Sequence, residues 1–162
     1  MNAFASTDIN LPEKYKEFFY AYCLTRTEGT RNNPEDSPFP RMVDMWFLAL
    51  CIAVKEGLKP NPDSSRGESY KAIEGVVFGS DNWRSNALML LAIAATGDVE
   101  ITDRPHDMMR IANAYALVGL PRLITILEDR GSDTALDHLS DFVVDLIHKD
   151  EDECSHTPAA RQ

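Results

Sequence analysis

Four aspartates near the carboxyl end of the chain stand four residues apart, at Asp133, Asp137, Asp141 and Asp145. An α-helix rises about 1.5 Å per residue, so this spacing places their carboxylates in one row at intervals of about 6 Å. Like charges at this spacing destabilise a helix by roughly 0.2–0.5 kcal/mol per pair, so an apolar face must hold the helix in place. The row is either a solvated surface or a binding site for a basic protein partner.

Three histidines and a cysteine lie among the acidic residues of the same region, at His138, His148, Cys154 and His156. Their spacing matches no zinc pattern, because the first two histidines are far apart and the last two candidate ligands lie in a polar tail. We therefore expect no bound metal ion and no other cofactor.

Asp44 is the one carboxylate within a strongly apolar segment. The simplest expectation is a half-buried carboxylate that pairs with Arg41 or another arginine, supported by the positive end of a helix. A general acid–base pair of Asp44 with Glu74 or Asp98 is the alternative, but nothing in the sequence places them within reach. The chain also lacks the GxSxG, GxGxxG, HExxH and P-loop motifs. These observations favour a protein without catalytic machinery.

Apolar residues recur at intervals of three and four along most of the chain, which predicts an all-α fold. We expect a single compact bundle of about six helices, with two polar loops at 26–39 and 59–67. The predicted helical domain covers residues 1–149, and a disordered acidic tail covers 150–162. The predicted helices cover 12–25, 40–56, 68–78, 80–95, a helical hairpin at 104–128 that breaks at Gly119 before Pro121, and 133–148. The helix at 80–95, which runs through Trp83 and the apolar segment ALMLLAIAA, is expected to be strongly buried.

The charge excludes several classes of function. The chain has 162 residues, a net charge of -10 and a pI near 4.7. Ten acidic and two basic residues fall between Glu128 and Glu153, so the acidity is concentrated in the predicted last helix and the tail. Direct contact with nucleic acid or with anionic lipid is disfavoured, because both depend on Lys and Arg.

The expected location is the cytoplasm, because the first residues show no basic stretch followed by an apolar run. The longest apolar stretch, residues 45–54, is shorter than the roughly 18 residues that a membrane-spanning helix needs. The three cysteines are an odd number without a CxxC pair, so we expect no disulfide.

Two stretches resemble a known family. Residues 38–60 read PFPRMVDMWFLALCIAVKEGLKP, and residues 87–127 contain an ATGD helix end followed by IANAYALVGLPRL. They resemble the small accessory proteins encoded beside bacterial DNA-phosphorothioation (Dnd-type) modification and restriction genes. The resemblance covers under half of the chain and departs from the family in the 26–39 loop and the acidic tail. Its most specific residues are Asp44, Thr96, Gly97, Asp98, Tyr115, Ala116, Gly119 and Leu120.

The resemblance implies an accessory subunit in a phage-defence or DNA-modification locus, with no catalytic residue to carry over. Three hypotheses follow. The first is a non-enzymatic helical interaction protein that binds a basic partner, such as a nuclease or helicase subunit, through the 104–128 hairpin or the acidic last helix. The second is a DNA mimic that inhibits a nucleic-acid enzyme through the acidic row. The third is a small enzyme with a site between Asp44, the Gly97–Asp98 turn and Tyr115.

Overall fold

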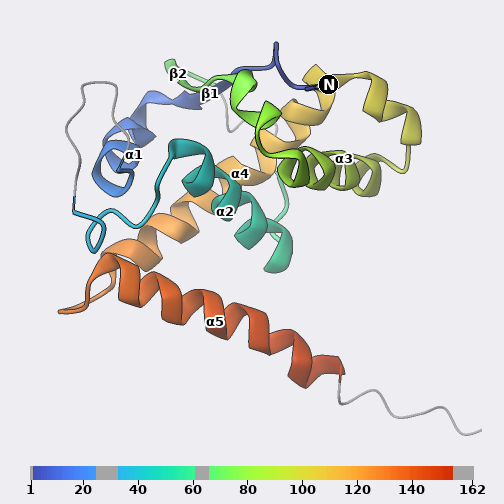
Figure 1. The fold of residues 1–162 in the computed structure, drawn as a ribbon. Coiled ribbons are helices and arrows are strands. Elements are labelled where there is room, and N and C mark those ends of the chain that lie inside the picture. Colours follow the sequence, from blue (N-terminus) through green and yellow to red (C-terminus); the bar gives the residue numbers. More distant parts are fainter. Residues whose placement is uncertain (1, 25–32, 61–65, 155–162) are drawn as a thin grey trace, which may run out of the picture.

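The computed structural model describes residues 2–24, 33–60 and 66–154, which form a mostly helical protein with a small two-stranded sheet (Figure 1). Over these ranges the α-helices are α1 Lys16–Tyr22, α2 Met42–Lys55, α3 Asn82–Thr96, α4 Pro105–Glu128 and α5 Ala135–Cys154. The strands are β1 Ile9–Pro12 and β2 Ser69–Ile73, and three short 3-10 helices are η1 Glu13–Tyr15, η3 Gly75–Gly79 and η4 Val99–Asp103. The predominantly helical prediction is confirmed, whereas the purely helical fold with six helices is wrong.

The core forms where α2 crosses α4, the central helix. Trp46 of α2 is fully buried, and its indole N–H donates to the Asn113 side chain of α4 over 3.0 Å. At the crossing a Cβ on Gly119 would overlap the carbonyl oxygen of Ala49, so glycine lets the two backbones touch. Further along the same pair of helices, Arg122 and Glu56 form an ion pair at 3.3 Å. Side-chain packing and a close backbone approach therefore hold α2 on α4.

Helix α4 is continuous, which corrects the predicted hairpin at 104–128. Gly119 is a packing position and not a break, and Pro121 lies inside the helix. A proline in a helix interior costs about 3 kcal/mol. Burial of an aliphatic side chain contributes about 1.5–3 kcal/mol, and Leu120, Leu123 and Leu127 are all fully buried around the proline. Packing therefore outweighs the local signals to stop.

By length and composition, α4 is the single helix within the described ranges that could cross a bilayer. Half of its most apolar window, 50%, is buried inside the protein. The packing of α4 against its neighbours accounts for this apolar composition.

The antiparallel pairing of β1 with β2 corrects two predictions. The first predicted helix, 12–25, is shortened to α1, because Pro12 pairs with Ser69 in the sheet. The predicted helix at 68–78 is β2 followed by η3. Gly75 marks the change, since a Cβ there would overlap the backbone of Phe4. The two strands lie far apart along the chain, so the pattern of residues within either segment does not reveal that they pair.

The boundaries of α2 and α3 confirm the predicted helices at 40–56 and 80–95 within one or two residues. Helix α5 begins at Ala135 and continues to Cys154, beyond the predicted end at His148. Adding residues to an existing helix is easy, so α5 continues through 150–154, the first residues of the predicted tail. Residues 155–162 lie outside the described residues. So do residue 25, the last of the first predicted helix, and residues 26–32 and 61–65 of the two predicted loops.

Candidate functional site: an apolar groove between α2, α3 and α5

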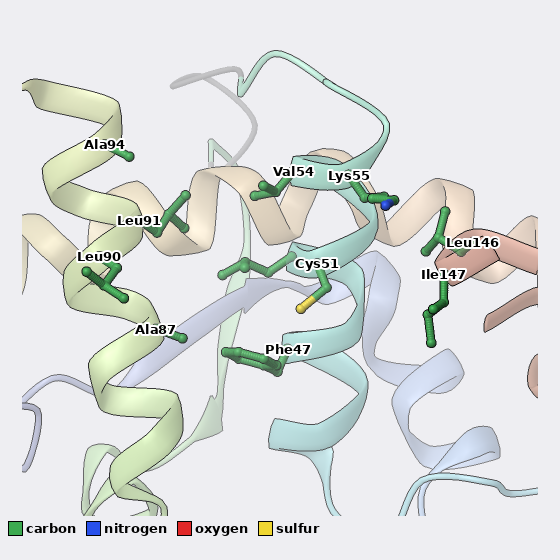
Figure 2. Close-up of a pocket in the computed structure, with 11 residues that line it drawn as sticks. Phe47, Cys51, Val54, Lys55, Ala87, Leu90, Leu91, Ala94, Leu146 and Ile147 are labelled. Atoms are coloured by element: carbon green, nitrogen blue, oxygen red, sulfur yellow. The ribbon is translucent and has the colours of Figure 1, made fainter. Parts of the chain in front are cut away.

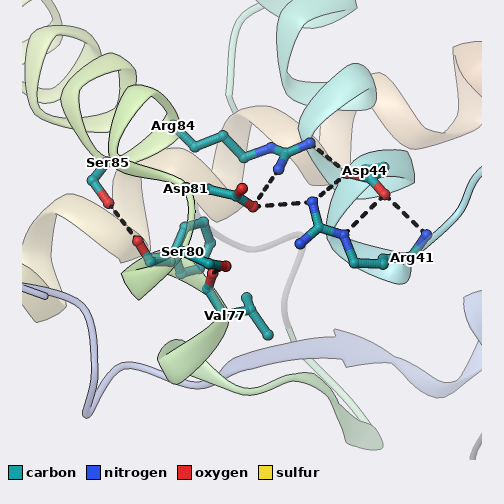
Figure 3. A network of polar contacts seen from close by, with 8 residues as sticks. Arg41, Asp44, Val77, Ser80, Asp81, Arg84 and Ser85 are labelled. Atoms are coloured by element: carbon teal, nitrogen blue, oxygen red, sulfur yellow. Dashed lines mark hydrogen bonds and ion pairs between the residues drawn. The ribbon is translucent and has the colours of Figure 1, made fainter.

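Four charged side chains join the amino-terminal ends of α2 and α3 (Figure 3). Arg41 donates to Asp44 over 3.1 Å and to Asp81 over 3.0 Å. Arg84 donates to Asp81 over 2.5 Å and also bonds to Asp44. Each carboxylate thus receives hydrogen bonds from two guanidinium groups. We call these four residues the clamp, because they fix the start of α3 to the start of α2.

Arg84 is the buried member of the clamp, with 8% of its side chain exposed. Its guanidinium lies 4.4 Å from the ring centroid of Trp83 and 5.5 Å from that of Phe47. These two rings meet edge to face with centroids 5.2 Å apart. Charge pairing and aromatic stacking together set the distance between α2 and α3 at this end.

The expected pairing of Asp44 with Arg41 is confirmed. Asp44 also accepts the backbone N–H of Arg41 over 2.9 Å, which caps the start of α2. The hydrogen bond from the Arg41 side chain to Asp44 raises the pKa of Arg41. A carboxylate held by two arginines and a backbone N–H stabilises a helix start and is poorly placed to accept a proton from a substrate.

Beyond the clamp, α2 and α3 run side by side in the same direction and line an apolar groove (Figure 2). Two residues from the middle of α5, which lie across α2 from α3 in Figure 2, also line it. The groove has a volume of about 650 Å³. Its lining residues are Phe47, Leu50, Cys51, Val54 and Lys55 of α2, Ala87, Leu90, Leu91 and Ala94 of α3, and Leu146 and Ile147 of α5.

The groove walls are exposed to an unusual degree for apolar residues. Leu90 of α3 is 67% exposed, Ile147 of α5 59% and Val54 of α2 47%. Trp83, at the clamp end, is 57% exposed. The sequence predicts α3 as a strongly buried helix, and this is wrong for Leu90 and Trp83. An apolar pattern favours the burial of a helix, but it does not show which of its residues the rest of the chain covers.

The lining of the groove is almost entirely apolar. Lys55 is the one charged residue in its lining, and the one charged residue of α3 is Arg84, which belongs to the clamp. Burial raises the pKa of the Cys51 thiol, so at neutral pH it is protonated and poorly nucleophilic. The groove can receive apolar surface, and apart from Lys55 and the Cys51 thiol its lining residues are hydrocarbon side chains.

The acidic row is shorter than its spacing predicts. Asp133 precedes α5, and Asp137 bonds to Thr134 at the start of that helix, with its N–H 3.1 Å from the Thr134 hydroxyl. Asp141 and Asp145 remain on the exposed side of α5, away from Leu146. In the part of the chain that the structure describes, the side chains of these two residues form no hydrogen bond or ion pair.

The residues of the family resemblance have local structural roles. Gly97 ends α3 with φ of 69°, in the left-handed region that glycine tolerates, as the sequence predicts for this position. Asp98 accepts the Glu100 N–H at 2.9 Å and pairs with Arg104 at 2.6 Å. Tyr115 is half-buried against the core, and Gly119 lies at the α2–α4 crossing.

The structure does not assemble the predicted enzyme site. Asp44 contacts the amino-terminal end of α3, whereas Asp98 follows its carboxyl end. A helix of this length spans about 22 Å, so the two carboxylates lie far apart. Glu74 pairs instead with Lys71, at 3.1 Å. Within the described ranges, no three His, Cys, Asp or Glu side chains gather as a metal site would require.

Comparison of the chain with protein-family models, with curated proteins and with solved structures finds no match. The site is therefore interpreted from its geometry.

Proposed function

We propose that this chain is a non-enzymatic interaction subunit and that the groove between α2, α3 and α5 is where it binds a partner protein. The observation that carries the proposal is the side-by-side exposure of Leu90, Val54 and Ile147 on one apolar groove. Exposed apolar residues scattered singly need no explanation, but a contiguous patch is typical of a binding surface. The geometry therefore moves the proposed contact from the predicted 104–128 hairpin, which is a core helix, to the groove.

The resemblance to accessory proteins of Dnd-type loci supports a finer proposal. We place the subunit in a bacterial DNA-modification and phage-defence complex in the cytoplasm, with a basic nuclease or helicase subunit as partner. The net charge of -10 supports contact with a basic protein and not with the DNA that such a partner binds.

The acidic row lends less support to a DNA mimic. Duplex DNA carries one negative charge per about 1.7 Å of its axis. Among the described residues, the row keeps two carboxylates without a bonding partner, Asp141 and Asp145, one helical turn apart, or about 6 Å. This arrangement suits a few ion pairs at the edge of an interface.

The test compares two variants that add the same charge at equally exposed positions. Leu90 in the groove and Val99 on η4 outside it are both 67% exposed. We expect tagged Leu90→Asp to lose a partner in pull-downs from the native host, because a carboxylate in the groove stays desolvated and unpaired. The matched Val99→Asp should retain it, with recovery measured by quantitative mass spectrometry. Equal recovery of every captured protein by both variants would remove the groove from the proposal.

A further inference from the structure

We propose that the occupant of the groove is an amphipathic α-helix with a basic outer face, presented by the partner protein. This inference rests on the proposed function and gives the partner its chemistry. It follows from the spacing of the lining residues, the openness of the groove and the charge around it.

The lining residues form two matching ridges. The uncharged lining residues are Phe47, Leu50, Cys51 and Val54 on α2, beside Lys55, and Ala87, Leu90, Leu91 and Ala94 on α3. Both sets follow the spacing i, i+3, i+4 and i+7, so each presents about two helical turns, or about 10 Å, to the groove. A third helix carrying the same spacing can place its own apolar stripe between these ridges. The small side chains of Ala87 and Ala94 leave room for large residues on either side of Leu90.

The openness of the groove favours a helix over a small molecule. Sites for small molecules enclose most of the ligand surface. Here Leu90, Val54 and Ile147 keep about half or more of their surface in solvent. A helix with side chains, about 10–12 Å in diameter, covers such residues from above and gains their burial.

The charge beside the groove, outside the lining in which Lys55 is the one charged residue, indicates a basic partner. Asp141 and Asp145 lie on the outer side of α5, within two turns of the wall residue Ile147. A protein that seats a helix in the groove can extend over α5 and pair its Lys or Arg side chains with these carboxylates. The net charge of -10 repels a second copy of this chain and an anionic lipid surface alike. Charge complementarity thus selects a basic protein helix.

The experiment titrates the full chain with fluorescent model peptides of about 14 residues and follows anisotropy. The first peptide carries Leu at i, i+3, i+4 and i+7 with Lys elsewhere. The second replaces each Lys by Gln, and the third scrambles the first, so that charge is kept and the stripe is lost. We expect the first peptide to bind at least about tenfold more tightly than the scrambled one. The Gln peptide should bind more weakly than the first at about 50 mM salt, and this difference should shrink at about 300 mM salt.

Protein variants locate the bound peptide. Leu90→Asp should weaken binding of the Lys peptide by about tenfold or more, and the matched Val99→Asp by less than about twofold. Asp141→Asn with Asp145→Asn should weaken it by about threefold at low salt only. Circular dichroism of each variant confirms that the fold is retained.

Several outcomes overturn the inference. Equal effects of Leu90→Asp and Val99→Asp, or equal binding of the Lys and scrambled peptides, show that the peptide does not use the groove. Preference for the Gln peptide contradicts the basic face. Two further results overturn the inference if the Lys peptide fails to bind. One is that the protein binds a fluorescent fatty acid and Leu90→Asp abolishes this binding. The other is that the protein sediments as a dimer and Leu90→Asp makes it a monomer. If the peptide fails but Leu90→Asp still loses a partner in the host, this inference falls and the proposed function stands.

Discussion

Replacement of Gly119 by alanine should destabilise the protein by about 3 kcal/mol, even though alanine is the better helix former by about 1 kcal/mol. The added Cβ would overlap the carbonyl oxygen of Ala49 and would lie 3.2 Å from the Cβ of Ala53. The atom in the way is backbone, so no side-chain rotation relieves the contact. Helices α2 and α4 would have to separate along the best-packed part of the core.

Urea unfolding of Gly119→Ala measures this effect. Ala114→Gly is the reference variant, because it replaces alanine by glycine at a half-buried position of the same helix. Its loss of stability measures how much helix propensity alone contributes. We expect Ala114→Gly to cost about 1 kcal/mol and Gly119→Ala clearly more. If Gly119→Ala made the protein more stable, glycine at this position would only weaken the helix. The close approach of α2 and α4 at Gly119 would then be contradicted.

Replacement of Arg84 by methionine should also cost about 3 kcal/mol. Asp44 and Asp81, each with 16% of its side chain exposed, would then share Arg41 alone. Methionine keeps a long apolar side chain but removes the guanidinium, so the loss reports on the ion pairs and on the cation–π contacts with Phe47 and Trp83 together. Removing one partner of a poorly solvated ion pair is costly because the remaining charged groups stay poorly solvated and lose a hydrogen-bond partner.

Arg41→Met is the matched control, because Arg41 donates to the same two carboxylates but is 42% exposed. We expect it to cost about 1 kcal/mol or less, as exposed pairs do. Adding Asp44→Asn to Arg84→Met should recover part of the lost stability, since one of the two carboxylates is removed. If Arg84→Met is no more harmful than Arg41→Met, the clamp does not depend on its buried member.

Features governed by local chemistry could be predicted from the sequence. Helices α2 and α3 begin and end close to the predicted positions because apolar periodicity, Gly57 and Gly97 act within a few residues. Asp44 was predictable as an ion-paired residue because Arg41 lies three residues before it. In each case the partner is near in the chain.

Features that depend on distant segments could not be predicted. The sheet needs β1 and β2 to meet, and α4 stays continuous through Gly119 and Pro121 because α2 packs against it. The groove is of the same kind: Leu90 was counted as core, and only the arrangement of α2, α3 and α5 shows that it faces solvent. The acidic row, the most conspicuous local pattern, loses Asp133 because α5 starts after it.

Site-specific photocrosslinking in the native host tests most directly whether the groove binds a partner. A benzophenone amino acid placed at position 90 samples the groove, and the same group at position 99 samples an equally exposed apolar position outside it. The account predicts a dominant adduct with one protein from position 90 and not from position 99, mapped by mass spectrometry to a basic amphipathic helix of that protein. The absence of an adduct at position 90, or the same adducts from both positions, would contradict it.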